Sequence, residues 1–95
     1  CKACHAVGPK AKNLIGPALN GVVGREAGKL EGFKFSKAMA GAGITWDAAQ
    51  LDEFLTKPSK MIKGTKMIFA GLKKKKQRDN LIAYLATFAA DGSTK

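Results

Sequence analysis

The first five residues, Cys1-Lys2-Ala3-Cys4-His5, restrict what this chain can fold into more than any other feature. They contain both cysteines and the one histidine of the 95 residues. Two thiols beside an imidazole fit a structural zinc site, a thioredoxin-like redox pair, or a C-x-x-C-H motif for covalent haem attachment. The cysteines could also have a purely structural role, buried or joined in a short disulfide. The motif alone leaves these alternatives open.

Two of the alternatives find little support in the rest of the chain. Structural zinc sites usually take four ligands as two separated pairs, and the sequence has no second Cys or His pair. A thioredoxin-like pair lies close to a βαβ pattern, and no stretch of this chain alternates convincingly with a period of two. The balance therefore shifts toward the haem-attachment motif.

The sequence predicts one all-α domain with long loops over residues 1–95. Glycine and proline are frequent over residues 6–35, which is typical of loops. We expect a short helix over 36–42, a helix over 46–57 with Thr45 as N-cap and Pro58 as its stop, a helical turn over 60–63, and a last helix over about 74–90. Residues 64–72 should form an apolar loop. Loops this long in a 10.0 kDa domain suggest that they surround a cofactor.

The charge balance predicts an acidic partner. The chain has 17 Lys and Arg against 7 Asp and Glu, a net charge of +10. Nucleic acid, anionic lipid and an acidic protein are all compatible with that charge. Arginine occurs only at Arg25 and Arg78, and lysine suits diffuse steering better than bidentate readout. This favours protein docking over specific nucleic-acid recognition. No apolar run approaches the roughly 20 residues of a transmembrane segment.

A haem iron held by His5 needs a second protein ligand or keeps an open position. Because no second histidine exists, the candidates are Met39, Met61 and Met67, although methionine usually fills a core. Met67 is favoured because it lies in the apolar loop 64–71, which has glycine at both ends. A thioether ligand favours ferrous iron and raises the reduction potential.

Six segments, in order along the chain, carry a resemblance to a known family: CKACH (1–5), GPAL (16–19), GR (24–25), GITW (43–46), GTKMIFAG (64–71) and DNLIAYL (79–85). This series resembles mitochondrial cytochrome c and its small soluble bacterial relatives, the class I cytochromes c. The resemblance implies helices and long loops around one covalently bound haem c. It further implies a soluble one-electron carrier, not an enzyme, whose iron cycles between ferrous and ferric.

The resemblance also implies roles for individual residues. Cys1 and Cys4 would form the thioether bonds, and His5 and Met67 would be the axial ligands of the iron. The carbonyl of Pro17 would accept a hydrogen bond from the His5 ring, and Arg25 and Trp46 would approach the haem propionates. The remaining expected cofactor-binding residues are Leu19, Phe54, Leu55, Thr65 and Phe69.

Three positions depart from the commonest family pattern. Met39 and Phe54 stand where the mitochondrial proteins usually have Asn and Tyr near the methionine ligand. Phe35 stands where a Tyr usually reaches a propionate. All three changes replace polar groups by apolar ones, so we expect a drier haem environment. Met39 also becomes an alternative ligand.

The family implies partners with acidic surfaces, such as a cytochrome bc1-type complex, a terminal oxidase or a photosynthetic reaction centre. Six lysines are the candidates for docking: Lys2, Lys12, Lys60, Lys66, Lys73 and Lys74. The expected location is the bacterial periplasm, with the mitochondrial intermembrane space as the alternative. Competing functions are a haem peroxidase or ligand sensor with an open iron, and a basic nucleic-acid or membrane-binding module without a cofactor.

The last expected helix presents an apolar stripe made of Leu81, Tyr84, Leu85 and Phe88, which must be buried. In the family an N-terminal helix precedes C-x-x-C-H and crosses this face. We therefore expect that the stripe is covered by an upstream helix from a longer mature protein, a separate segment or a neighbouring copy.

Overall fold

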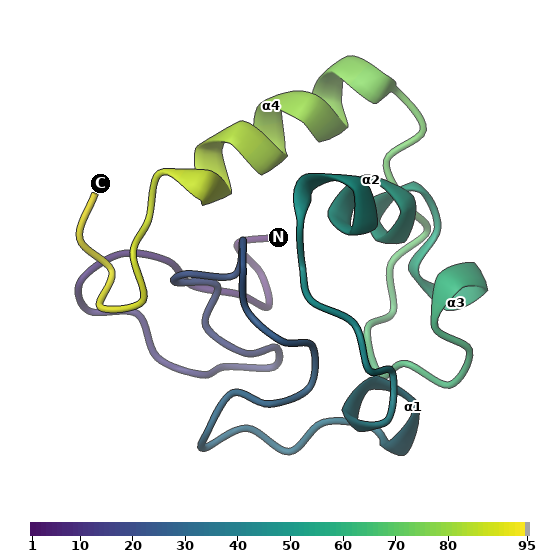
Figure 1. Ribbon diagram of the computed structural model, residues 1–95, viewed down its shortest axis with the longest axis horizontal. Helices are drawn as coiled ribbons and strands as arrows, with labels where there is room; N and C mark the ends of the chain where they lie inside the picture. The colour runs from purple at the N-terminus through teal and green to yellow at the C-terminus, as the bar shows by residue number, and fades with distance from the viewer. Residues whose placement is uncertain (95) are drawn as a thin grey trace.

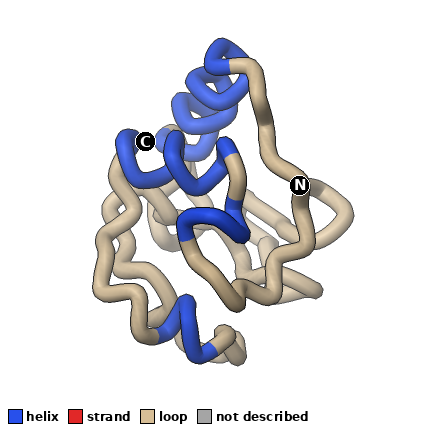
Figure 2. The backbone as a smooth tube through the Cα atoms, turned by 90° about the vertical axis from the view of Figure 1, so that its right-hand side faces the viewer, coloured by secondary structure: helices blue, strands red, loops and turns tan. Residues whose placement is uncertain are grey.

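The computed structural model describes residues 1–94, so Lys95 of the expected domain lies outside the described residues. Within these residues, four α-helices are joined by long loops (Figure 1): α1 (Lys37–Ala40), α2 (Ala48–Thr56), α3 (Pro58–Met61) and α4 (Lys75–Ala86). Over residues 1–94 the structure has no strand, and isolated bridges pair Glu26 with Thr45 and Phe88 with Thr94. The expected all-α class with long loops is confirmed, and loops make up much of the tube in Figure 2. No helix in this part of the chain is long and apolar enough to cross a membrane.

The loop segment 1–35 and the helices occupy different parts of the molecule. In Figure 1 α4 runs along the top, most of the loop segment lies below it at the left, and α2 and α3 lie below it at the right. A short extended contact joins the two parts, because Ala27 N–H donates to Ile44 O at 2.8 Å and Trp46 N–H donates to Arg25 O at 2.8 Å. This pairing holds Trp46 in an extended segment before α2.

The start of α2 differs from the prediction, which placed the N-cap at Thr45. Asp47 is the N-cap, and its Oδ1 accepts a hydrogen bond from Gln50 N at 2.8 Å. Thr45 is wrong as a cap because it belongs to the bridge with Glu26. The negative charge of an Asp at this position also interacts favourably with the positive end of the helix dipole.

Pro58 separates α2 from α3 and explains a second difference. The prediction that α2 ends before Pro58 is confirmed, since α2 ends at Thr56. Pro58 is also the first residue of α3, where its missing N–H costs no helical hydrogen bond. The helical turn expected over 60–63 therefore lies two residues earlier, at Pro58–Met61. The short helix expected over 36–42 is present as α1, with Ser36 Oγ accepting from Met39 N at 3.1 Å.

The last helix is shorter than expected. It ends at Ala86, after which Thr87 Oγ1 donates to Tyr84 O at 2.6 Å and the chain turns back, with Ala89 N donating to Ser93 O at 2.8 Å. The expected end near Ala90 is therefore wrong, because the Thr87 hydroxyl and the following turn satisfy the terminal carbonyls instead.

The buried face of α4 also differs from the predicted stripe. The buried residues of the helix are Arg78, Ile82 and Leu85, whereas Tyr84 is 54% exposed. Leu81 is half-buried, as is Phe88 beyond the end of the helix. The four stripe residues therefore do not form one buried face. Tyr84 and Phe88 contact each other edge to face, with ring centroids 5.2 Å apart.

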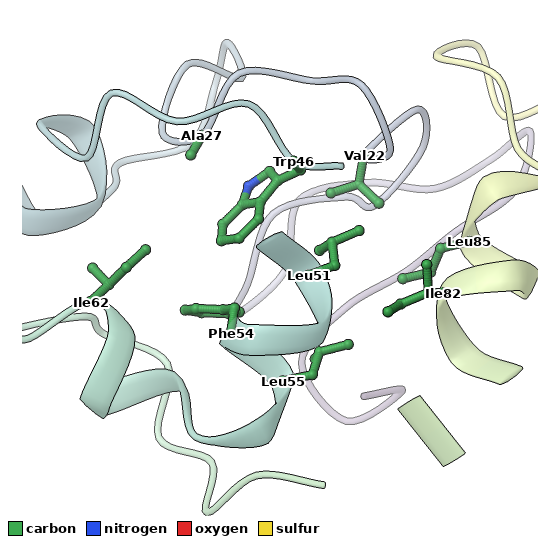
Figure 3. Close-up of a cluster of buried hydrophobic side chains, with 9 residues drawn as sticks. All are labelled: Val22, Ala27, Trp46, Leu51, Phe54, Leu55, Ile62, Ile82 and Leu85. Atoms are coloured by element: carbon green, nitrogen blue, oxygen red, sulfur yellow. The ribbon is translucent and has the colours of Figure 1, made fainter. Parts of the chain in front are cut away.

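Helix α2 is the centre of the core, because it packs against both α3 and α4. Figure 3 shows the nine buried apolar residues, which are Val22, Ala27, Trp46, Leu51, Phe54, Leu55, Ile62, Ile82 and Leu85. The rings of Trp46 and Phe54 lie 4.9 Å apart between centroids, tilted by 55°. Fully burying a large side chain of this kind stabilises the fold by roughly 1.5–3 kcal/mol. Loop residues and helix residues therefore share one small core.

Candidate functional site

A largely apolar cavity of about 520 Å³ lies between the loop segment and the helices. It is lined by four of the first five residues (Cys1, Ala3, Cys4 and His5), by loop residues before α1, by Trp46 and α2, by the loop before α4, and by two leucines of α4. All twelve expected cofactor-binding and metal-binding residues line this one cavity: Cys1, Cys4, His5, Pro17, Leu19, Arg25, Trp46, Phe54, Leu55, Thr65, Met67 and Phe69. The fold thus brings together residues that lie far apart in the sequence.

The first residues form a single turn that presents both thiols and the imidazole to the cavity. The carbonyl of Cys1 accepts hydrogen bonds from Cys4 N at 3.1 Å and from His5 N at 2.8 Å. Cys1 is exposed and Cys4 is half-buried, and neither thiol forms a disulfide within the described residues. Two free thiols on one turn fit covalent attachment to a group inside the cavity better than a short disulfide.

The ring of His5 is held in one orientation. Its Nδ1 lies 2.8 Å from Pro17 O, and because a carbonyl oxygen only accepts, Nδ1 carries the proton. The Nε2 lone pair is then free to bind a metal ion. Gly16 is buried against the ring, and a Cβ at this position would lie 2.7 Å from His5 Nδ1 and 2.8 Å from Nε2. The glycine before Pro17 therefore leaves the space that the imidazole occupies.

Met67 reaches the cavity from the loop before α4. It is half-buried and lines the cavity, whereas the neighbouring Ile68 is fully exposed. The Met67 N–H donates to Thr65 Oγ1 at 3.3 Å, and Lys66 Nζ donates to Lys34 O at 3.1 Å. The first hydrogen bond lies within the loop, and the second joins the loop to the segment before α1.

The three methionines differ in whether they line the cavity. Met39 lines the cavity together with Met67, whereas Met61 is outside the described lining and packs against the core. The cavity wall therefore offers two thioethers, not three. Phe35 and Phe54 also line it, so the apolar replacements noted in the sequence face the cavity.

Arg25 supplies a positive charge to an otherwise apolar wall. Its Nη1 donates to Ala18 O at 3.0 Å and to Asn20 O at 3.2 Å. Partial burial lowers the pKa of the guanidinium from its ordinary value. Arginine side chains in proteins stay charged at neutral pH. No carboxylate of residues 1–94 forms a salt bridge with Arg25. A carboxylate of a bound group is a suitable partner for such a cation.

Several lining residues were not predicted. Phe33 packs edge to face on Phe35, with ring centroids 4.9 Å apart, and Gly28 approaches the backbone of α1 so closely that a Cβ would lie 2.7 Å from Ala40 Cα. For Phe33, the available sequence signal was the presence of two aromatic residues two positions apart in a glycine-rich loop. The other unpredicted lining residues include Val22 and Leu51, and also Leu81 and Leu85, whose helical stripe predicted burial but not a place in the cavity wall.

The donor set fits covalently attached haem. Two unpaired thiols, one imidazole with a free Nε2 and two thioethers line a largely apolar cavity together with the half-buried guanidinium of Arg25. Iron accepts imidazole and thioether ligands in proteins that transfer electrons. Apolar walls suit a flat macrocycle, and Arg25 suits its carboxylates.

Comparisons with known proteins agree with this chemistry. The family model described as cytochrome c matches residues 1–89. The chain is 54% identical to cytochrome c2 of Rhodoblastus acidophilus over 98% of this chain and 87% of that protein. It is 47% identical to cytochrome c-550 of Nitrobacter winogradskyi over 100% of this chain and 87% of that protein. The solved structure of cytochrome cH from Methylobacterium extorquens covers 92% of this chain and 87% of that chain, with 48% identity and a TM-score of 0.86.

Proposed function

The chain belongs to the cytochrome c family, and from this premise we propose how its own residues bind haem c and exchange electrons with partners. Its function is that of a one-electron carrier with covalent haem c. When bound, haem c supplies one-electron chemistry between ferrous and ferric iron. The residues of the chain supply attachment, ligation, orientation and exclusion of water.

The observation that carries the proposal is the hydrogen bond between His5 Nδ1 and Pro17 O, at 2.8 Å. It selects the tautomer in which Nε2 is the ligand and holds the ring plane. Cys1 and Cys4, on the same turn, form the thioether bonds. Met67 would be the second protein ligand of the iron, which would leave no open position for a substrate.

The wall residues have two roles in this proposal. Leu19, Leu55 and Phe69 exclude water, together with Phe54, and Thr65 holds the backbone of Met67 through the 3.3 Å hydrogen bond. Arg25 and Trp46 receive the propionates. Because a dry site disfavours the extra positive charge of ferric iron, the apolar wall raises the reduction potential. Met39 is the alternative thioether if Met67 is displaced.

We further propose that the mouth of the cavity is the docking surface. Ile15 is 78% exposed and Ile68 is fully exposed, and both line the cavity, so both lie at its rim. All six candidate docking lysines are exposed: Lys2, Lys12, Lys60, Lys66, Lys73 and Lys74. The net charge of +10 favours an acidic protein surface, as on a membrane redox complex of a respiratory or photosynthetic chain. The periplasm is the proposed location.

The exposed side of α4 supports a separate proposal about its surroundings. Tyr84 is 54% exposed and contacts the half-buried Phe88, so part of this aromatic pair is exposed. We propose that an upstream helix outside these 95 residues covers the pair. A form extended by about a dozen upstream residues, a little over three helical turns, should then melt at a higher temperature. Equal melting temperatures for two monomeric forms would contradict this.

Mass spectrometry and absorption spectroscopy test the main proposal. Protein matured in a host with c-type biogenesis should retain haem after denaturation, with a mass equal to polypeptide plus haem. Replacing both Cys1 and Cys4 by Ser should leave haem that denaturant removes. The oxidised protein should show six-coordinate low-spin iron. A bare polypeptide mass, or a high-spin spectrum, would rule the proposal out.

A further inference from the structure

The loop that carries Met67 is fastened where it leaves the cavity. Leu72 N–H donates to Leu55 O in α2 at 2.7 Å. Gly71, with φ of +110°, lies against the end of α2, where a Cβ would meet the backbone of Thr56. The exit of the loop therefore contacts the same helix whose Phe54 and Leu55 line the cavity.

Arg78 of α4 adds a second attachment at the same point. Its side chain is only 11% exposed, Nη1 donates to Leu72 O at 2.8 Å, and Nε donates to Asp52 Oδ1 of α2 at 2.7 Å. One guanidinium thus joins α4, α2 and the end of the loop. Arg78 does not line the cavity, so the cofactor-binding set leaves its burial unexplained.

The distance along the chain makes this attachment relevant to Met67. Only four residues separate Met67 from Leu72, and Phe69 between them lines the cavity. At the start of the loop, Thr65 N–H donates to Ile62 O at 3.2 Å. With Thr65 and Leu72 both held, few backbone conformations remain for residues 65–72. If Leu72 were free, Met67 could move by several ångströms.

We propose that Arg78, held by Asp52, is a positioning residue that keeps the sulfur of Met67 at the iron by fastening Leu72. The inference rests on the proposed ligation by Met67. It requires an arginine, because Nε and Nη1 must donate to two acceptors in different directions. A lysine in its place has one nitrogen on a flexible stem and cannot hold both acceptors in the same geometry.

The test uses the oxidised holoprotein with imidazole as the competing ligand. The sulfur-to-iron charge-transfer absorption reports Met67 ligation, and an imidazole titration measures how easily Met67 leaves. Arg78→Lys should bind imidazole about tenfold more tightly than the unmodified protein, the factor expected when one hydrogen bond from a charged group is lost. Asp52→Asn keeps an acceptor for Nε and should give a smaller increase.

Two control variants separate positioning from general destabilisation. Lys75→Ala removes an exposed ion pair with Asp79 on the same helix, at 3.0 Å, and should leave imidazole binding unchanged. Ile82→Ala creates a cavity in the core beside α2 and should lower the denaturation midpoint at least as much as Arg78→Lys. Its imidazole affinity should nevertheless rise less than that of Arg78→Lys.

The outcomes distinguish this inference from the proposed function. If the unmodified protein lacks the charge-transfer absorption, Met67 ligation is wrong and this inference falls with it. If the absorption is present and Arg78→Lys binds imidazole as the unmodified protein does, only the positioning role is wrong. A rise in affinity that follows global stability equally in Ile82→Ala and Arg78→Lys would also overturn it.

Discussion

The Nδ1 atom of His5 lies 2.8 Å from the carbonyl oxygen of Pro17, twelve residues further along the chain. This hydrogen bond joins the first turn of the chain to the loop that follows it. It holds the imidazole plane, and it leaves Nε2 as the free nitrogen. Gly16 is buried beside the same ring.

Enlarging Gly16 should disturb this arrangement. In Gly16→Ala the new Cβ would meet the His5 ring, with Nδ1 at 2.7 Å, so the imidazole must move. We expect a destabilisation of about 1–3 kcal/mol from overpacking and a weakened iron–imidazole bond. Denaturant unfolding and the low-spin absorption spectrum measure the two effects. Gly41→Ala is the control, because its Cβ would approach only Lys37 O, at 3.2 Å.

Met67→Ala should open the iron to added ligands and lower the reduction potential, because the thioether favours ferrous iron. We expect imidazole affinity to rise by about tenfold or more, which corresponds to 1.4 kcal/mol per decade. Met61→Ala should leave ligand binding unchanged, since Met61 is outside the described lining of the cavity. If Met39→Ala opens the iron and Met67→Ala does not, the two thioethers have been assigned the wrong way round.

Reversing the charges of Lys66 and Lys73 should slow association with an acidic redox partner. Both side chains are exposed, and Lys66 lines the mouth of the cavity. The effect should be largest at low salt and should shrink as the Debye length falls from about 10 Å at 0.1 M to about 3 Å at 1 M. Stopped-flow rates measure it. The same reversal at exposed Lys10 should change the rate less, and an equal change at Lys10 would argue against a localised docking surface.

The Asp52–Arg78 contact should make stability depend on acid. The hydrogen bond from Arg78 lowers the pKa of Asp52 below its ordinary value of 3.8. A carboxyl group whose pKa is lower in the folded state stabilises the fold above its unfolded pKa, and loses that contribution as pH falls through the folded value. Stability should therefore drop below about pH 4, and Asp52→Asn should show a smaller drop over that range. Denaturant midpoints measured from neutral to acid pH test this, with Asp79→Asn as the exposed control. If the midpoint of Asp52→Asn falls with acid as much as that of the unmodified protein, the pair does not have this role.

Much of the site could be predicted because its chemistry depends on rare residue types. Cys1, Cys4 and His5 have no competitors in the sequence, and Met67 has only two. Glycine at both ends of 64–71 marked the loop, and the structure brings all of these residues to one cavity. Their roles in binding remain predictions for the experiments above.

Helix ends were predicted less well, because neighbouring capping groups compete. Thr45 and Asp47 are both good N-cap residues. Because the backbone of Trp46 pairs with Arg25, the chain is still extended at Trp46, and the helix is capped by Asp47. At the other end of the chain, the Thr87 hydroxyl ended α4 at a point that the apolar pattern did not show.

The sequence by itself determined which side chains are available as metal ligands, the all-α class and the strongly basic character of this protein, because these follow from residue types and local spacing. Only the tertiary structure decided which face of α4 is buried, that Arg78 is enclosed between α2 and the loop exit, and that Leu81 and Leu85 line the cavity. The physical reason is that burial is a property of pairs of elements. A helical pattern shows which side chains share a face, but the partner that packs on the helix decides whether that face is buried and which polar groups it must satisfy.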